Sequence, residues 1–305
     1  MGRYLIKRFV HALVVLFLVA TTVFFIMRVV GDPATLMLDA NATPAEYEQL
    51  KESLGLNDPL PFQYVHFLRD MATLDLGTSY RYKRPVVDMI AEALPYTMAL
   101  VGLAMLLAIP LAMGVGILAA VKRNSWLDNL LTSLTITGRS MPAFWLGLLL
   151  MYIFAVVLKL LPPSGAGGFR YLILPSVTLS MGLATSTVRL TRNSMLSVIR
   201  QDYMTTAKAK GVSAAQLLVG HGLRNSLVSV ITMIALQIGN LLGGSIVVET
   251  VFSYPGIGRV LITGILVYDY PVVQASVVIM AALFVGINLL VDLLYTVIDP
   301  RISVQ

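Results

Sequence analysis

The chain has 305 residues, of which 57% are hydrophobic and only 12% are charged. Soluble domains carry about 25% charged residues, and a globule of this size cannot bury so large an apolar surplus. With a net charge of +6 and no cysteine, the chain also lacks a disulfide framework, a thiol nucleophile and thiolate metal ligands. The composition therefore predicts an integral membrane protein, and its positive charge indicates basic loops at the membrane rather than nucleic-acid binding.

The N-terminal apolar run, 9–30, is expected to stay in the membrane. It is longer than the hydrophobic region of a signal peptide, and no small-residue cleavage site follows it. The Gly-Asp-Pro sequence at 31–33 is instead typical of a helix exit. Further on, the Thr-Pro pair at 43–44 is a helix start signal, which predicts a short amphipathic helix from Ala45 to Leu54.

Six apolar stretches approach or exceed the length of about 20 residues that an α-helix needs to cross the hydrocarbon core. They predict an all-α membrane protein with about six transmembrane helices. Their ranges are 9–30, 95–121, 132–160, 172–190, 227–248 and 271–297. The expected organisation is a first helix with an outer segment (1–94), a five-helix core (95–297) and a short tail (298–305).

Basic residues near the span ends orient the chain, because cytoplasmic loops are enriched in Lys and Arg. With the N-terminus inside, the only basic residues of the two short outer loops are Arg170 and Arg259. The long outer segment 31–94 contains more acidic than basic residues. The inner segments contain Arg3, Lys7, Arg8, Lys122, Arg123, Arg189, Arg192, Arg200, Lys208, Lys210, Arg224 and Arg301. We therefore expect both termini in the cytoplasm.

Prolines, glycines and ionisable residues interrupt the apolar stretches. The prolines that predict kinks are Pro95, Pro110, Pro142 and Pro175. The glycines that allow close helix approach, in a tight bundle or along a transport path, are Gly114, Gly116, Gly239, Gly243 and Gly244. The ionisable residues near span ends, which are expected to snorkel toward water, are Arg28, Lys159, Glu249 and Asp269.

Residues 194–226, called the elbow below, form the most informative cytoplasmic segment. Ser194 to Lys210 has helical character, and Gly211 stands where a helix C-terminal glycine belongs. The Ser-Ala-Ala-Gln sequence at 213–216 is a capping box that opens a second helix. We expect a helix, a glycine turn and another helix at the membrane surface. Small and basic residues before the turn are Thr205, Thr206, Ala207, Lys208, Ala209 and Lys210.

Three interpretations of the elbow remain open. A basic amphipathic elbow can rest on anionic lipid headgroups. Small residues also let a helix end enter a groove, which favours docking to a cytoplasmic partner. A DNA-binding helix-turn-helix is disfavoured, because the elbow is tethered between two spans and lacks a recognition helix rich in Arg, Asn and Gln.

The sequence lacks the patterns of enzymatic and metal sites. It contains no Gly-Lys pair and hence no phosphate-binding loop, so the chain is not expected to bind ATP itself. Neither a His-Glu-x-x-His zinc sequence nor a Gly-x-Ser-x-Gly nucleophile sequence occurs. The histidines His11, His66 and His221 are far apart. We expect no catalytic site, metal or cofactor in this chain.

Polar residues recur at roughly helical spacing in and after the fifth predicted span. They are Gln237, Asn240, Ser245 and Glu249. Polar groups inside a membrane bundle often mark a substrate path. Hydrogen bonding between helices explains them equally well, so they are candidates for a path with both explanations open.

Within the elbow, residues 202–211, Asp-Tyr-Met-Thr-Thr-Ala-Lys-Ala-Lys-Gly, resemble the cytoplasmic signature of binding-protein-dependent ABC transporter permeases. The general signature is Glu-Ala-Ala, three residues, then Gly. Ala207 and Gly211 match it, whereas Thr205 and Thr206 replace its Glu and its first Ala. That departure is similar to the dipeptide and oligopeptide branch, which commonly reads Thr-Ala-Arg-Ala-Lys-Gly.

The resemblance extends over nearly the whole chain and is closest to the first permease subunit of that branch. The matching stretches are 54–60, 63–64, 75–79, 84–86, 221–225, 244–252, 254–259, 269–274 and 299–301. Together they are specific, although none would suffice alone.

The resemblance implies a permease subunit of an ATP-driven importer in the bacterial inner membrane, with the type I permease fold. A second permease subunit would complete the path, and two separate ATPase subunits, carrying ATP and Mg²⁺, would bind the elbows. An extracytoplasmic binding protein would deliver substrate, with the loop 249–270 as its contact. ATP binding would swing the elbows and reverse the path, which is a rigid-body transition. The coupling residues implied are Tyr203, Thr205, Thr206, Ala207, Lys208, Ala209, Lys210 and Gly211.

Two alternatives from other classes stay open on the sequence alone. A self-sufficient secondary carrier or channel predicts inverted repeats or more buried charges, and no clear repeat is visible. A structural membrane protein leaves the docking shape of the elbow without a mechanical role. For the importer, peptides are the expected substrates, and the related branch also moves glutathione, nickel complexes and other small solutes.

Overall fold

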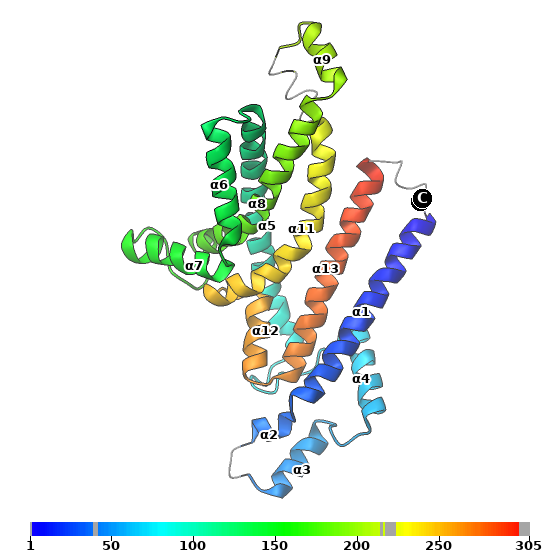
Figure 1. The fold of residues 1–305 in the computed structure, drawn as a ribbon. Helices are drawn as coiled ribbons and strands as arrows, with labels where there is room; N and C mark the ends of the chain where they lie inside the picture. Colours follow the sequence, from blue (N-terminus) through cyan, green and yellow to red (C-terminus); the bar gives the residue numbers. More distant parts are fainter. Residues whose placement is uncertain (1, 39–41, 214–215, 217–223, 299–305) are drawn as a thin grey trace. The chain divides into compact units, whose positions relative to one another are not determined.

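The structure, a computed structural model, describes residues 2–38, 42–213, 216 and 224–298, with the side chains of most of them. Every regular element in this part of the chain is helical, apart from one isolated bridge between Thr78 and Pro85. Figure 1 shows the helices in chain order. They are α1 (Gly2–Val30), α2 (Pro33–Met37), α3 (Pro44–Ser53), α4 (Leu60–Thr73), α5 (Val86–Val121), α6 (Trp126–Ser140), α7 (Ala143–Met151), the π-helix η1 (Tyr152–Val157), α8 (Phe169–Ile199), α9 (Asp202–Ala209), α11 (Arg224–Val251), α12 (Ile257–Leu266) and α13 (Tyr270–Ile298).

Several of these helices are long and apolar enough to cross a membrane. The four that qualify are Ile6–Val29 in α1, Val86–Val121, Phe169–Ile199 and Tyr270–Val291 in α13. A bent pair, α6 with α7 and η1, adds a fifth if it is counted as one span. The span predicted at 227–248 falls on α11, whose side chains the structure describes only in part. The predicted fold class, an all-α membrane protein, is confirmed.

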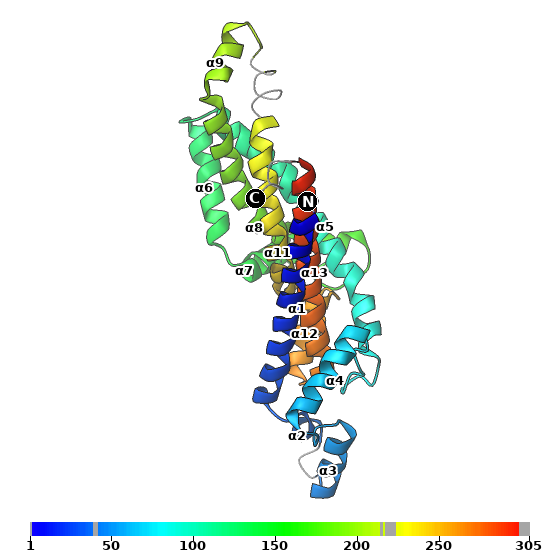
Figure 2. The same cartoon turned by 90° about the vertical axis from the view of Figure 1, so that its right-hand side faces the viewer.

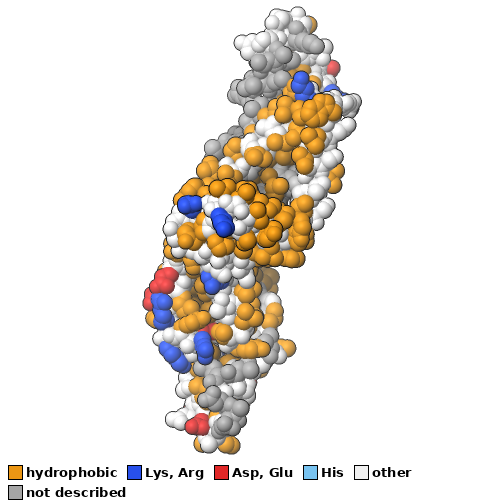
Figure 3. All heavy atoms as spheres, turned by 90° about the vertical axis from the view of Figure 1, so that its left-hand side faces the viewer, with side chains coloured by type: hydrophobic (Ala, Val, Ile, Leu, Met, Phe, Trp, Pro, Cys, Tyr) orange, Lys and Arg blue, Asp and Glu red, His pale blue; other side chains and the backbone are white. Residues whose placement is uncertain are grey.

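Exposed hydrophobic side chains along α1 agree with lipid as the solvent. Phe9, Leu13 and Phe17 are each at least half exposed. On the face drawn in Figure 3, hydrophobic side chains cover much of the surface, and charged ones gather in small groups. An apolar surface of this extent is typical of a membrane or subunit contact.

The third predicted span, 132–160, is wrong as a single continuous helix. α6 ends at Ser140 and α7 begins at Ala143, and the segments Trp126–Gly138 and Ala143–Val157 are bent by 103°. Pro142 explains the break. Proline disfavours a helical conformation in the residue before it and cannot donate a backbone hydrogen bond.

Two compact units divide the chain, Met1–Thr97 with Pro255–Gln305 and Met98–Tyr254. Helix α5 begins in the first unit and ends in the second. The division at residue 94 that the sequence predicts stays a prediction.

In the first unit, α1 packs along α13, and α12 also packs against α13 (Figure 2). Phe24 of α1 is fully buried and contacts the rings of Tyr64 and Phe67 on α4. The guanidinium of Arg28 lies 3.5 Å from the centroid of the Phe24 ring and donates to the side chain of Gln63 on α4 at 3.0 Å. Aromatic packing and this hydrogen bond therefore hold α4 against the last turns of α1.

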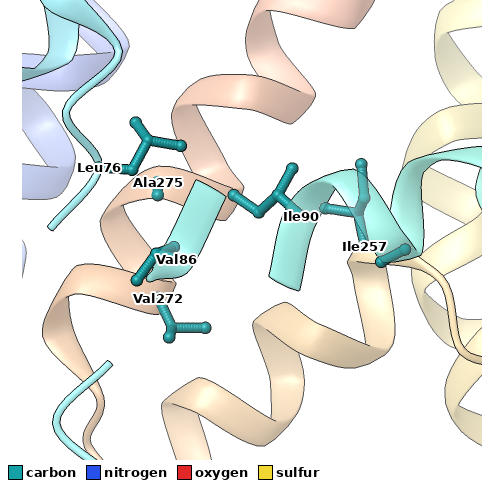
Figure 4. Packing of buried hydrophobic residues seen from close by; sticks show 7 residues of the cluster. Leu76, Val86, Ile90, Ile257, Val272 and Ala275 are labelled. Atoms are coloured by element: carbon teal, nitrogen blue, oxygen red, sulfur yellow. The ribbon is translucent and has the colours of Figure 1, made fainter. Parts of the chain in front are cut away.

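A buried hydrophobic cluster forms the core of the first unit (Figure 4). It joins the start of α5, the start of α12 and the first turns of α13, and each member is at most 5% exposed. The members are Leu76, Val86, Ile90, Ala93, Ile257, Val272 and Ala275. Because burial of apolar area is favourable wherever the residues lie in the sequence, this cluster fixes three distant segments against one another.

The predicted helix from Ala45 to Leu54 is confirmed as α3, Pro44–Ser53. The Thr43 N–H donates to the Glu46 carboxylate at 2.7 Å, and the Glu46 N–H donates back to the Thr43 hydroxyl at 3.3 Å. This reciprocal pair is a capping box, which satisfies backbone donors that a helix start leaves unpaired. The bonds from the Thr43 N–H and hydroxyl also lower the pKa of Glu46.

In the second unit, α8 is the central helix and packs against α6, α7 and α11. Helix α5 also approaches α8 closely at Gly116. A Cβ added there would lie 2.7 Å from the Cβ of Thr191 and 2.8 Å from the carbonyl oxygen of Val188. The predicted close approach is confirmed at Gly116, whereas nothing lies within 4 Å of a Cβ added at Gly114.

Candidate functional site

The helix predicted from Ser194 to Lys210 is divided between two helices. α8 continues past the predicted span to Ile199, and α9 begins at Asp202, beyond the end of α8 (Figure 1). On α9, the side chain of Met204 is only 2% exposed.

Gly211 forms the turn that the sequence predicts. Its φ of +81° lies in the left-handed region, which glycine enters without the steric cost that other residues carry. The Val212 N–H donates to the Ala207 carbonyl at 3.3 Å, five residues back. A left-handed glycine with this bond is typical of a Schellman helix end, so the predicted C-terminal glycine is confirmed.

The exposed part of α9 carries most of the residues that the resemblance implicates in coupling. Exposed residues are Tyr203, Thr205, Thr206, Ala209, Lys210 and Gly211, and Ala207 is half-buried. The side chain of Lys208 and the second predicted helix, which covers 214–215 and 217–223, lie outside the described residues. Of the predicted capping box, the Ser213 hydroxyl accepts from the Gln216 N–H at 3.4 Å. The accessible surface of α9 thus combines the ring of Tyr203 with small and polar side chains, which suits docking to a partner.

A bidentate ion pair that the sequence analysis missed joins α6 to α8, about two turns before α8 ends. The Nε and Nη2 atoms of Arg192 donate to the two carboxylate oxygens of Asp128, each at 2.8 Å. The Asp128 side chain is 3% exposed and also accepts from the Asn124 N–H at 3.0 Å. The spacing of Ser125 and Asp128 signals only the start of α6, where the Ser125 hydroxyl accepts from the Asp128 N–H, and gives no sign of the Arg192 partner. The pair gives α6 and α8 a fixed attachment beside the elbow.

The four candidate path residues separate into two groups. Gln237 and Asn240 line a pocket of about 230 Å³ between α7, α8 and α11, and the Asn240 amide donates to the Gln237 side chain at 3.4 Å. Ser245 is fully buried and donates to the Leu242 carbonyl at 2.9 Å. Glu249 is also fully buried, so the expectation that it snorkels toward water is wrong. Only the first two residues border open space in this unit.

Asp269 is buried as well, and the expectation that it snorkels is wrong. Its carboxylate accepts a hydrogen bond from the Ser79 hydroxyl, and bonds from the N–H groups of Tyr80 at 3.0 Å and Arg81 at 3.2 Å. Three donors on one turn therefore replace the water that the carboxylate gives up on burial. Burial raises the pKa of the neighbouring Tyr80 to about 12, and the Asp269 charge adds to the rise.

Among the described residues, no group of three or more His, Asp or Glu side chains is arranged to hold a metal ion. His221 lies outside them.

Two protein families match adjacent parts of the chain. Residues 112–304 match the family described as binding-protein-dependent transport system inner membrane component. Residues 1–101 match its N-terminal companion, described as binding-protein-dependent transport system membrane component, N-terminal.

Individual relatives match over the full length. The chain is 46% identical over 303 residues to the glutathione transport system permease protein GsiC of Pectobacterium atrosepticum, and 43% identical over 303 residues to GsiC of Escherichia coli strain K12. Each match covers 99% of this chain and 99% of the relative. A solved inward-facing structure of the MetNI methionine ABC transporter superposes with a TM-score of 0.62 at 19% identity, over 70% of this chain and 98% of that one. That likeness shows the fold.

Proposed function

The chain belongs to the family of binding-protein-dependent transport system inner membrane components, and from this we propose that it forms half of the translocation path of a peptide importer. As a member of this family it is a multi-pass permease subunit of a bacterial ABC importer in the inner membrane. The family implies ATPase subunits and a substrate-binding protein as partners.

The proposed assembly contains a second, related permease and two ATPase subunits. ATP and Mg²⁺ are bound by those ATPases, and this chain contributes mechanical coupling without catalysing a reaction or binding nucleic acid. Both termini and the elbow lie in the cytoplasm, and residues 31–94 lie outside. Support comes from the distribution of Lys and Arg between the predicted loops.

The proposed substrates are small peptides, with glutathione included among them. Full-length identity of 46% to a glutathione transport permease supports this substrate class. The Thr-for-Glu replacement at 205 also resembles the dipeptide and oligopeptide branch. Within the path, Gln237 and Asn240 are the proposed contacts because they border the pocket of the second unit. Ser245 and Glu249 then support α11 from its buried side.

The observation that carries the proposed coupling is the shape of α9 and its glycine turn. Apart from Tyr203, the exposed face of α9 is small and polar, and the left-handed Gly211 redirects the chain shortly after it. An ATPase groove that receives this end can pull on α8 through the short connection at 200–201. The Asp128–Arg192 pair transmits that motion to α6, so that two helices move as one rigid element.

Substitution of Gly211 tests this coupling. Proline fixes φ near −65° and cannot adopt the +81° that the turn needs, whereas asparagine enters the left-handed region at low cost. The measurement is ATP-driven uptake of labelled glutathione and a labelled dipeptide by proteoliposomes containing the full complex and its binding protein. We expect Gly211→Pro to abolish uptake and Gly211→Asn to keep most of it, with both variants present in the membrane at wild-type amounts.

Wild-type uptake by Gly211→Pro would show that the elbow does not couple ATP to transport. Solute movement by the chain alone, without ATPase subunits or ATP, would instead favour the self-sufficient carrier.

A further inference from the structure

A pocket of about 630 Å³ with a mixed polar and apolar lining opens in the first unit, on the side of the unit that carries the loops 78–85 and 255–256. Two segments far apart in sequence supply its walls, namely the loop before α5 together with the first turns of α5, and the first turns of α12 with the two residues before them. Its chemistry is mixed, with two guanidinium groups, one carboxylate and two phenol rings. The residues that carry this chemistry are Tyr82, Arg84, Glu92, Tyr96 and Arg259.

The floor of the pocket is rigid. Met89 and Ala93 of α5 and Val260 of α12 line it, and all three belong to or pack against the buried cluster shown in Figure 4. The Ile257 N–H donates to the buried hydroxyl of Thr97 at 2.9 Å and ties α12 to α5. A site built on fixed elements binds without a large cost of ordering.

The loop that carries Tyr82 and Arg84 is also held in place. The Ser79 N–H donates to the Arg84 carbonyl at 2.9 Å and closes the loop. Buried Asp269 accepts the bonds of the same loop described above, from the Ser79 hydroxyl and two backbone N–H groups. The buried carboxylate therefore positions the pocket wall without facing the pocket.

The polar groups of the pocket remain accessible. Arg84 and Glu92 form an ion pair at 2.6 Å, yet their side chains are 50% and 65% exposed. An exposed pair of this kind contributes about 0–1 kcal/mol to stability, so it does not explain why two arginines and a glutamate meet here. Tyr82 and Tyr96 are 49% and 40% exposed, which leaves aromatic surface facing water beside these charges.

We propose that this pocket is a binding site for the charged ends of a small peptide, on the outer face of the permease. The proposal rests on the proposed function, because it places the pocket outside and takes its ligand from the same substrate class. Guanidinium groups bind carboxylates through paired, charge-assisted hydrogen bonds. Glu92 accepts from the peptide ammonium, and the tyrosine rings attract the same cation. The volume lies within the range of about 300–1,000 Å³ typical of small-molecule sites.

In this arrangement the peptide takes over the interaction between Arg84 and Glu92. Its carboxylate replaces Glu92 at Arg84, and its ammonium replaces Arg84 at Glu92, while Arg259 supplies a second positive group to the carboxylate end. The site thus recognises termini that every free peptide has, and it places no demand on side chains.

The experiment measures binding of trialanine to the purified permease–ATPase complex in nanodiscs, without the binding protein, by isothermal titration calorimetry. Trialanine is chosen because its methyl side chains leave the termini as the only charged groups, and N-acetyl-trialanine amide is the matched uncharged probe. We expect Arg84→Gln and Arg259→Gln each to weaken trialanine binding about tenfold, which is about 1.4 kcal/mol. Binding of the capped peptide should be weak in all proteins.

Arg81→Gln is the control, because Arg81 belongs to the same loop and is exposed but does not line the pocket. Its side-chain replacement keeps the backbone N–H that Asp269 accepts. We expect it to bind trialanine like the wild type. Equal affinities in wild type, Arg84→Gln and Arg259→Gln, or no binding by the wild type, would overturn the site. The site would also be overturned if Arg84→Gln and Arg259→Gln bound trialanine normally and weakened only the capture of the binding protein.

Uptake by wild-type proteoliposomes separates this proposal from the proposed function. ATP-driven peptide uptake together with unchanged trialanine affinities in the variants overturns the pocket and leaves the importer standing. Absence of ATP-driven uptake overturns the proposed importer function, regardless of the trialanine affinities.

Discussion

At the scale of single residues, Asp128 shows why a buried charge needs its partner. Its carboxylate is 3% exposed, and Arg192 neutralises it through two bonds of 2.8 Å. Removing one member of such a pair leaves the other charge buried without compensation, which costs more than the intact pair contributes.

We therefore expect Arg192→Gln to destabilise the protein by about 3 kcal/mol. The measurement is the thermal unfolding midpoint of the purified complex in mild detergent. Arg189→Gln is the matched control, since Arg189 lies one turn away on α8 and is exposed. The double variant Asp128→Asn with Arg192→Gln should recover part of the loss, because no buried charge remains. Equal midpoints for Arg192→Gln and Arg189→Gln would show that the pair is energetically unimportant.

Burial of Tyr80 makes the stability of the folded protein depend on pH in the alkaline range. Burial raises its pKa from 10.0 to about 12, partly offset by the Arg28 charge. Because the folded state holds the proton more tightly than the unfolded chain, the contribution of Tyr80 is complete below pH 10 and is lost as the pH rises toward 12.

Between about pH 9 and about pH 11.5, Tyr80→Phe should therefore lose less thermal stability than the wild type does. Tyr82→Phe is the control because Tyr82 is 49% exposed, and it should follow the wild type. If the thermal stability of Tyr80→Phe fell with pH as steeply as that of the wild type, Tyr80 would not be the source of the pH dependence.

At the scale of helices, the contact of α5 with α8 depends on a glycine. A methyl group at 116 would lie 2.7 Å from a Thr191 carbon and 2.8 Å from a backbone oxygen of α8, so the two helices would have to separate. Neither atom belongs to the far end of a flexible side chain, and rotation cannot relieve the clash.

Gly116→Ala should therefore cost about 1–3 kcal/mol, although alanine is the better helix former. Gly114→Ala, which meets nothing within 4 Å, should be neutral or slightly stabilising. Thermal midpoints and membrane yields of the two variants check this. A Gly116→Ala protein as stable as Gly114→Ala would mean that α5 and α8 are not in close contact.

At the scale of the whole molecule, the exposed apolar surface and the family assign the chain to a membrane complex. A tagged chain extracted from its native membrane in mild detergent should co-purify with a second permease and ATPase chains, identified by mass spectrometry. Gly211→Pro should reduce the ATPase yield and leave the second permease, since only the elbow is altered. Recovery of the chain alone or only with itself would contradict the proposed assembly.

Local patterns predicted much of this protein from its sequence. Apolar runs longer than the bilayer is thick require helices, because backbone groups in lipid must bond within their own segment. The Thr43 capping box and the Gly211 turn were predictable for a similar reason, since each depends on a few consecutive residues. The family was also accessible, because its signature is a contiguous stretch in the elbow.

Only the tertiary structure decided the rest. The partners of Asp128 and Asp269 lie 64 and up to 190 residues away, so spacing along the chain gave no sign of them, and both burial and bonding differ from the expectation for isolated charges. The separation of α9 from α8 was likewise not visible in the helical pattern of 194–210. The pocket of the first unit is the extreme case, since the stretch 82–96 and the start of α12 meet only through the buried core of that unit. Sequence alone determines elements because their energetics are local, whereas sites arise from contacts that the folded chain creates.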